Sequence, residues 1–129
     1  MKKALYFVVL ILLISACKEA TGLEAEVIAI HDEVMPKMGD MHLARKNLRK
    51  IAKEVESDSI KTNIFKMIKD LEQADEGMMT WMHEWKVPAN EPEKTTYLEK
   101  EKVKITKVKE DMLSSLETAN NFIAKSNLK

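Results

Sequence analysis

The sequence is poor in the residues that build loops and sites. Three glycines among 129 residues leave no material for a glycine-rich loop that cradles a phosphate. The single cysteine, Cys17, excludes an intramolecular disulfide. Basic and acidic residues are equal in number, 21 of each, so no positive excess indicates nucleic acid as a partner. What the chain does have is charge, at 33% of its residues, and nine methionines.

The first 17 residues have the pattern of a bacterial lipoprotein signal peptide. Lys2 and Lys3 precede an apolar stretch over residues 4–14, which is too short for a permanent transmembrane helix of about 20 residues. Ile14 to Cys17 resemble a lipobox, in which the cysteine receives a diacylglycerol before cleavage. The alternative is ordinary secretion with a free thiol, a liability in an oxidising compartment.

We therefore expect cleavage before Cys17 and a lipid on Cys17 that holds the chain to a membrane outside the cytoplasm. The expected place is the outer membrane, on its periplasmic face or at the cell surface. Removal of residues 1–16 takes away two lysines and no acid, which leaves an excess of two negative charges. A short tether over residues 18–22 and one helical domain over residues 23–126 should follow.

Apolar residues recur in that domain at alternating spacings of four and three, the period of amphipathic helices packed on one another. The stripes predict helices over about 23–55, 58–86 and 93–125. Pro36 removes a backbone donor and predicts a kink in the first. Short connections make neighbours antiparallel, so we expect an all-α, up-down-up antiparallel three-helix bundle. The alternative is a kinked hairpin that completes its core by dimerising.

Two stretches carry a resemblance to known proteins. They are VIAIHDEVMPKMGDM over residues 27–41 and ADEGMMTWMHEW over residues 74–85. With the Lys/Glu-rich third helix, they are similar to small flavobacterial lipoproteins often labelled "viral A-type inclusion protein". The resemblance covers nearly the whole processed chain and implies no activity. Lys18 and Glu19 are also similar to the charged start that directs some lipoproteins of that phylum to the cell surface.

No pattern indicates catalysis. His31, Asp32 and Glu33 are consecutive, so they point in different directions around a helix and do not converge. Ser114 and Ser115 have no histidine within a helix length in sequence. We therefore expect a protein that is not an enzyme, and a small-molecule carrier has no support beyond a methionine-rich core.

The distribution of methionine is the most unusual feature of the helical domain. Six of the eight methionines beyond Met1 fall in two short segments of the first and second predicted helices, and the antiparallel register brings these segments level. Thioether and imidazole groups together are ligands of Cu(I) or Ag(I). The candidate ligands are His31, Met35, Met38, Met79, Met82 and His83. The alternative is that methionine, an adaptable side chain, fills an irregular core around the kink.

Two charged residues interrupt otherwise apolar stripes, Lys37 in the first helix and Glu101 in the third. The predicted register puts them at nearly the same height on parallel helices, so they should form a structural ion pair. The alternative is that the kink turns Lys37 outward, Met38 takes its place and Glu101 reaches solvent along its own stem.

The sequence thus predicts a non-enzymatic, lipid-anchored envelope protein, structural or binding an unidentified envelope protein partner, with no role in binding nucleic acid. The alternative function is a periplasmic Cu(I) or Ag(I) binder that uses the methionine and histidine level.

Overall fold

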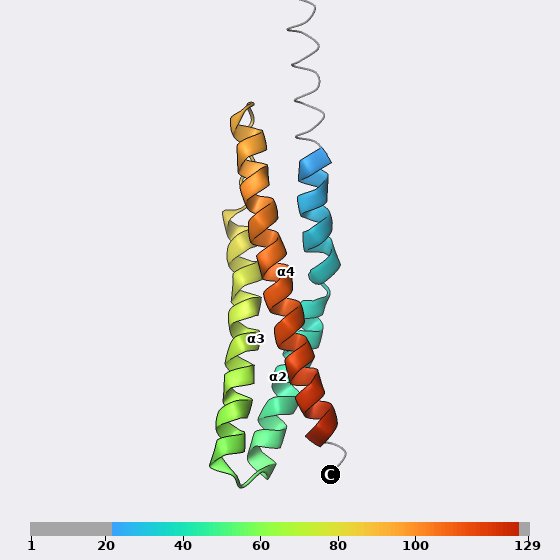
Figure 1. Cartoon of the computed structure of the whole chain (residues 1–129), viewed down its shortest axis with the longest axis vertical. Coiled ribbons are helices and arrows are strands. Elements are labelled where there is room, and N and C mark those ends of the chain that lie inside the picture. The colour runs from blue at the N-terminus through green and yellow to red at the C-terminus, as the bar shows by residue number, and fades with distance from the viewer. Residues whose placement is uncertain (1–21, 127–129) are drawn as a thin grey trace, which may run out of the picture.

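The computed structural model describes residues 22–126, and nearly all of this range is helical (Figure 1). Residues 22–34 are helical, and α2 (Lys37–Glu54), α3 (Asp58–Glu84) and α4 (Glu93–Ser126) follow. Residues 22–126 contain no strand, so the predicted all-α class is confirmed. The signal peptide, Cys17 and the tether up to residue 21 lie outside the described residues. Within the described range, no helix combines the length and the apolar character that crossing a membrane requires.

The kink predicted at Pro36 is present. The N–H of Met38 donates to the carbonyl of Met35 at 3.2 Å, a tighter turn than the α-helical spacing. Pro36 keeps helical dihedral angles, φ −61° and ψ −23°, but has no N–H to donate. The first stripe therefore forms two helical pieces, residues 22–34 and α2, in place of one continuous helix over 23–55.

Local polar contacts close the two connections. The hydroxyl of Ser57 accepts the N–H of Ile60 at 3.4 Å and caps the start of α3. At the other end, α3 stops at Glu84, two residues before the predicted end, because the backbone becomes extended at Trp85. The carboxylate of Glu91 then accepts the hydroxyl of Thr95 at 2.8 Å and its N–H at 3.3 Å, which fixes the first turn of α4.

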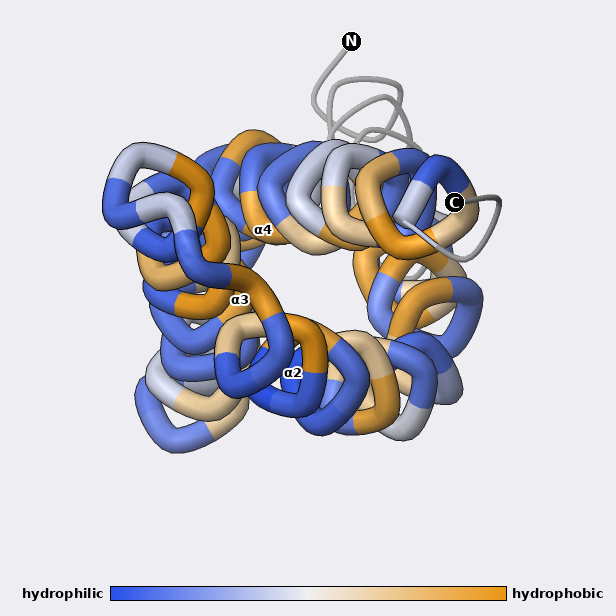
Figure 2. The backbone as a smooth tube through the Cα atoms, turned by 90° about the horizontal axis from the view of Figure 1, so that it is seen from below, coloured by the Kyte–Doolittle hydropathy of each residue, from blue (hydrophilic) through white to orange (hydrophobic). Residues whose placement is uncertain are grey.

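Figure 1 shows residues 22–34 and α2 descending, α3 rising and α4 descending again. Each of α2, α3 and α4 contacts the other two. Seen along the long axis, hydrophobic positions gather toward the middle of the group (Figure 2). The end of the molecule at residue 22 is therefore also the end that carries the connection between α3 and α4.

The core follows a strict seven-residue period. Fully buried side chains stand at Val27, Val34, Met41 and Leu48, at Ile64, Leu71 and Met78, and at Leu98, Ile105, Met112 and Ala119. A seven-residue apolar period is the pattern of helices that pack in a slight left-handed supercoil. The first series keeps its phase through the break at Pro36, so the kink bends the chain without turning its apolar side away from the core.

Ion pairs join residues 22–34, the first helical segment, to the last helix, α4. They are Glu24 with Lys94 at 2.9 Å, Glu26 with Lys102 at 2.5 Å and Glu33 with Lys109 at 2.6 Å. Two of these pairs join residues 76 positions apart, so residues 22–34 run beside α4 in the same direction. Acidic residues thus concentrate on the first segment and meet lysines on the helix to which no turn connects it.

Candidate functional site

One of the two histidines of the predicted metal level, His31, has other partners. The ring of His31 lies 5.6 Å from the ring of Trp81, centroid to centroid, with 30° between the planes. Its Nδ1 is 2.9 Å from a carboxylate oxygen of Asp32. His31 is therefore held between an aromatic ring and an acid of its own helix.

The other predicted ligands lie in two further surroundings. Met79, with 51% of its surface exposed, and the exposed His83 lie on the outer side of α3. Met35, Met38 and Met82 are half-buried and pack against the core. No group of three or more His, Cys, Asp or Glu side chains in residues 22–126 is placed to hold a metal ion. The six candidate ligands thus lie in three different surroundings and do not form one site.

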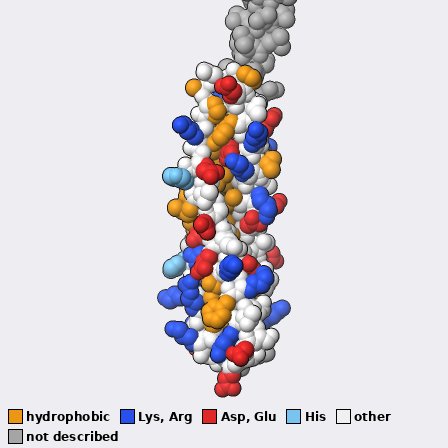
Figure 3. Space-filling view, turned by 90° about the vertical axis from the view of Figure 1, so that its left-hand side faces the viewer, with side chains coloured by type: hydrophobic (Ala, Val, Ile, Leu, Met, Phe, Trp, Pro, Cys, Tyr) orange, Lys and Arg blue, Asp and Glu red, His pale blue; other side chains and the backbone are white. Residues whose placement is uncertain are grey.

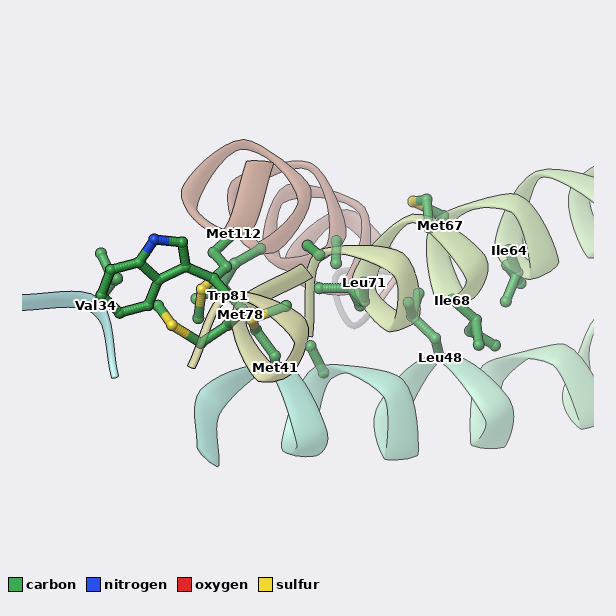
Figure 4. Close-up of a cluster of buried hydrophobic side chains, with 14 of the residues drawn as sticks. Val34, Met41, Leu48, Ile64, Met67, Ile68, Leu71, Met78, Trp81 and Met112 are labelled. Atoms are coloured by element: carbon green, nitrogen blue, oxygen red, sulfur yellow. The ribbon is translucent and has the colours of Figure 1, made fainter. Parts of the chain in front are cut away.

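The methionines that the structure does bring together are in the core. Met41 of α2, Met78 of α3 and Met112 of α4 are fully buried members of one apolar cluster. Figure 4 shows their side chains entering the same region of the core from three helices. The sequence predicted Met112 as an apolar stripe residue of the third helix, but did not join it to the methionine level because it stands alone in its segment. The signal was its place in the seven-residue series of α4.

Tilted aromatic rings lie next to one another at the end of the molecule that holds residue 22. Trp81 lies 4.9 Å from Trp85, and Trp85 lies 5.8 Å from Tyr97, between ring centroids. The hydroxyl of Tyr97 accepts the N–H of Lys86 at 2.7 Å. Aromatic pairs at such centroid distances contribute about 0.5–1.5 kcal/mol each beyond the area they bury. With His31, these rings join residues 22–34, the end of α3 and the start of α4.

The predicted ion pair between Lys37 and Glu101 is wrong. Lys37 reaches Asp40, on its own helix, at 3.5 Å. Glu101 is the one buried charged residue in the described range, and its Oε1 meets the ammonium of Lys104 at 2.8 Å. The hydrogen bond to Glu101 raises the pKa of Lys104 above its ordinary value of 10.5. The second carboxylate oxygen of Glu101 is buried with no hydrogen-bond partner among the described residues.

The alignment of residues 22–34 along α4 explains why Lys37 and Glu101 do not pair. The offset of 76 between the first segment and α4 puts Lys37 level with Leu113, and Glu101 level with Ala25. The two charges are then about 12 residues, or about 18 Å, apart along the axis. The alternative holds for Lys37, which is only half-buried while Met38 packs against the core. It does not hold for Glu101, which stays buried and draws Lys104 to it.

Comparison with known proteins identifies no relative. No family model, curated protein or solved structure matches the chain. The function proposed below therefore rests on the residues and geometry of this chain.

A groove of about 340 Å³ lies between α3 and α4. Its lining is Met67, Asp70, Gln73, Ala74, Asp111, Ser114, Ser115 and Thr118. Asp70 pairs with Lys66 at 2.7 Å, and Asp111 pairs with Lys107, each one turn away on the same helix. Ser115 donates its hydroxyl to the carbonyl of Met112 at 3.1 Å. The polar groups of the groove are thus engaged by their own helices, as on a solvated seam.

A second groove, between α2 and α3, is crossed by ion pairs. Arg45 meets Asp75 at 3.1 Å and Arg49 meets Glu72 at 2.7 Å. Met79 and His42 also line it. The exposed pair Arg49–Glu72 contributes well under 1 kcal/mol, whereas the more enclosed pair Arg45–Asp75 has less solvent to screen it. These pairs fix the register of the two antiparallel helices.

Proposed function

We propose that the protein is a lipid-anchored, non-enzymatic helical bundle of the bacterial envelope, which acts by contacting an envelope protein partner. The observation that carries the proposal is the lipobox-like run from Ile14 to Cys17 placed directly before the helical domain. Only residues 18–21 separate Cys17 from the helical residue 22. An anchor at Cys17 therefore holds the domain close to the membrane surface. The outer membrane, on its periplasmic face or at the cell surface, is the proposed place.

In this proposal the domain is an up-down-up antiparallel three-helix bundle with a kinked first helix. The seven-residue core series on all three long helices supports it, because each supplies fully buried side chains to one cluster. The ion pairs from the first segment to α4 also support it, since they close the bundle on the side that no connection spans. The hairpin that needs a second copy has less support, because these contacts complete the core within one chain.

The anchor also orients the bundle. The connection between α3 and α4 lies at the same end as residue 22, so it stands next to the membrane. The start of α3 is at the far end, about 40 Å away at 1.5 Å per residue. Phe65, exposed at 58%, and Met79, exposed at 51%, are 14 residues apart and so lie on one side of α3. Figure 3 shows hydrophobic side chains among the charges on the face that α3 contributes to. We assign partner contact to this face.

Metal binding through the six residues predicted from the sequence has less support. Its ligands would have to come from an exposed pair, three half-buried methionines and a histidine whose ring already lies against Trp81. The bundle proposal needs no such rearrangement.

Changing Cys17→Ser tests the anchor. We expect loss of labelling by a palmitate analogue and release of the protein from the membrane fraction, because the thiol is the acceptor of the lipid. The double variant Cys17→Ser, Ser59→Cys restores a thiol at an exposed position and is the matched control. It should stay unlabelled. Labelling of Cys17→Ser at the wild-type level would refute the anchor.

A photo-crosslinking residue in place of Phe65 tests the partner in living cells. We expect one main adduct with another protein, and its loss when Cys17→Ser removes the anchor. The same residue in place of Glu117, exposed on α4, is the control and should give no such adduct. Equal adducts at positions 65 and 117, or adducts that persist without the anchor, would contradict the assignment.

A further inference from the structure

Buried methionines from all three helices meet in one part of the core. Met41, Met78 and Met112 have no exposed surface, and the offset of 76 places Met112 about five residues, or about 7.5 Å, nearer the residue-22 end than Met41. The neighbouring positions of the three seven-residue series hold branched residues, Val34, Leu48, Leu71 and Ile105. Methionine is flexible and specifies a core poorly, so three in one part of the core are a departure from the rest of it.

Side-chain direction brings the three sulfurs toward one another. Long side chains on a helix lean toward its N-terminus. Because α3 runs opposite to α2 and α4, Met78 leans one way along the axis while Met41 and Met112 lean the other. Figure 4 shows the three side chains converging on the same region of the core. Their unbranched chains let the sulfur atoms adjust without backbone movement.

We propose that Met41, Met78 and Met112 form a binding site for one soft monovalent metal ion, Cu(I) or Ag(I), inside the bundle. Thioethers are neutral, soft ligands that need lose no proton to bind, and they favour Cu(I) over hard cations. Three of them around one point supply a trigonal sulfur set. Neither oxygen nor imidazole from residues 22–126 forms a group that competes for a harder ion. The site goes beyond the proposed envelope role and does not depend on the lipid.

Three further methionines lie between the surface and this part of the core. Met35, Met38 and Met82 are half-buried against the same core. The break at Pro36 lies about one turn before Met41, where the backbone lacks a helical hydrogen bond and so opens more easily. These thioethers give a soft ion a route into an otherwise closed bundle.

One ion pair lies near the site. Asp75 is three residues before Met78, so both lie on one side of α3. One oxygen of Asp75 pairs with Arg45 at 3.1 Å, and the other is buried with no hydrogen-bond partner among the described residues. A buried cation costs free energy unless charge or ligands compensate it. Because Asp75 is already paired with Arg45, the pair supplies no net charge, and the three thioether ligands must supply the compensation.

Titration of the purified protein with Ag(I) against a competing chelator tests the site, followed by Cu(I) under anaerobic reducing conditions. Every protein carries Cys17→Ser, because a free thiol would bind either ion. We expect one ion per chain, a higher melting temperature with the ion bound, and an X-ray absorption spectrum of the Cu(I) form with sulfur as the sole ligand atom. Met78→Leu and Met112→Leu keep core volume and should each weaken binding by at least about tenfold.

Two matched variants separate the site from general methionine chemistry. Met67→Leu removes a buried methionine of α3 that Figure 4 places away from the three, and Met79→Leu removes an exposed one. Both should bind the ion as the parent does. Met41→Leu gives a third ligand variant if one of the others does not fold. No binding in competition, binding unchanged in folded Met78→Leu and Met112→Leu, or equal loss in Met79→Leu would each overturn the proposal.

Discussion

Glu101 is the residue at which this core departs most from its own pattern. Its side chain is only 4% exposed, one oxygen has Lys104 as its partner, and the other has none among the described residues. Lys104 is itself 54% exposed, so it reaches in from solvent to meet the carboxylate. A buried charge with an unsatisfied oxygen is weak evidence for stability, because the desolvation cost can exceed the gain from pairing.

Replacing Glu101→Leu should therefore leave the bundle as stable or make it more stable, by up to about 2 kcal/mol. Leucine matches the residues at neighbouring core positions and removes the unsatisfied oxygen. Urea unfolding measures the change in free energy. Glu117→Leu, an exposed position of the same helix, is the control and should change stability by under about 0.5 kcal/mol. A loss of more than about 1 kcal/mol in Glu101→Leu would show that the carboxylate stabilises the fold.

Lys104 gives a pH dependence with a definite sign. Its hydrogen bond to Glu101 raises its pKa in the folded protein above 10.5. The stability it contributes is therefore fully present below pH 10.5 and is lost as pH rises through the folded pKa. Wild type should lose more stability than Lys104→Met over that alkaline range in urea unfolding at stepped pH. A constant difference between the two proteins through the alkaline range would contradict the pairing.

At the scale of elements, two kinds of contact set the register. Antiparallel neighbours are placed by their short connections and by pairs such as Arg45–Asp75. Residues 22–34 and α4 share no connection, so their register depends on the ion pairs between them and on core packing. Exposed pairs contribute only about 0.2–1 kcal/mol each, but they favour one offset over its neighbours.

Two double-mutant cycles test this register. Glu33→Gln with Lys109→Met should show a coupling free energy of about 0.2–1 kcal/mol that falls with added salt. Lys37→Met with Glu101→Leu should be additive, because the two charges lie on different levels. Coupling above about 1 kcal/mol in the second cycle, or no coupling in the first at low salt, would contradict this register. Such a result would favour the alignment predicted from the sequence, in which Lys37 and Glu101 lie at the same height.

At the scale of the whole molecule, local signals in the sequence were enough for the helical class and the kink at Pro36. Spacing and proline act within a few residues, so one sequence carries them fully. The prediction that Lys37 and Glu101 lie at the same height was wrong because it depended on the assumed centres of two turns. Each residue of error in such a centre shifts a helix along the axis by about 1.5 Å. Met112 was not joined to the other methionines for a related reason. It is alone in sequence and joins Met41 and Met78 only when three helices pack.

The central claim is that this bundle is held to a membrane through Cys17. The intact mass of the wild-type protein extracted from membranes tests it most directly. We predict a chain that begins at Cys17 and is heavier than residues 17–129 by a diacylglycerol, with or without a further acyl group. A chain that still begins at Met1, or one that begins at Cys17 with no added mass, would contradict the claim.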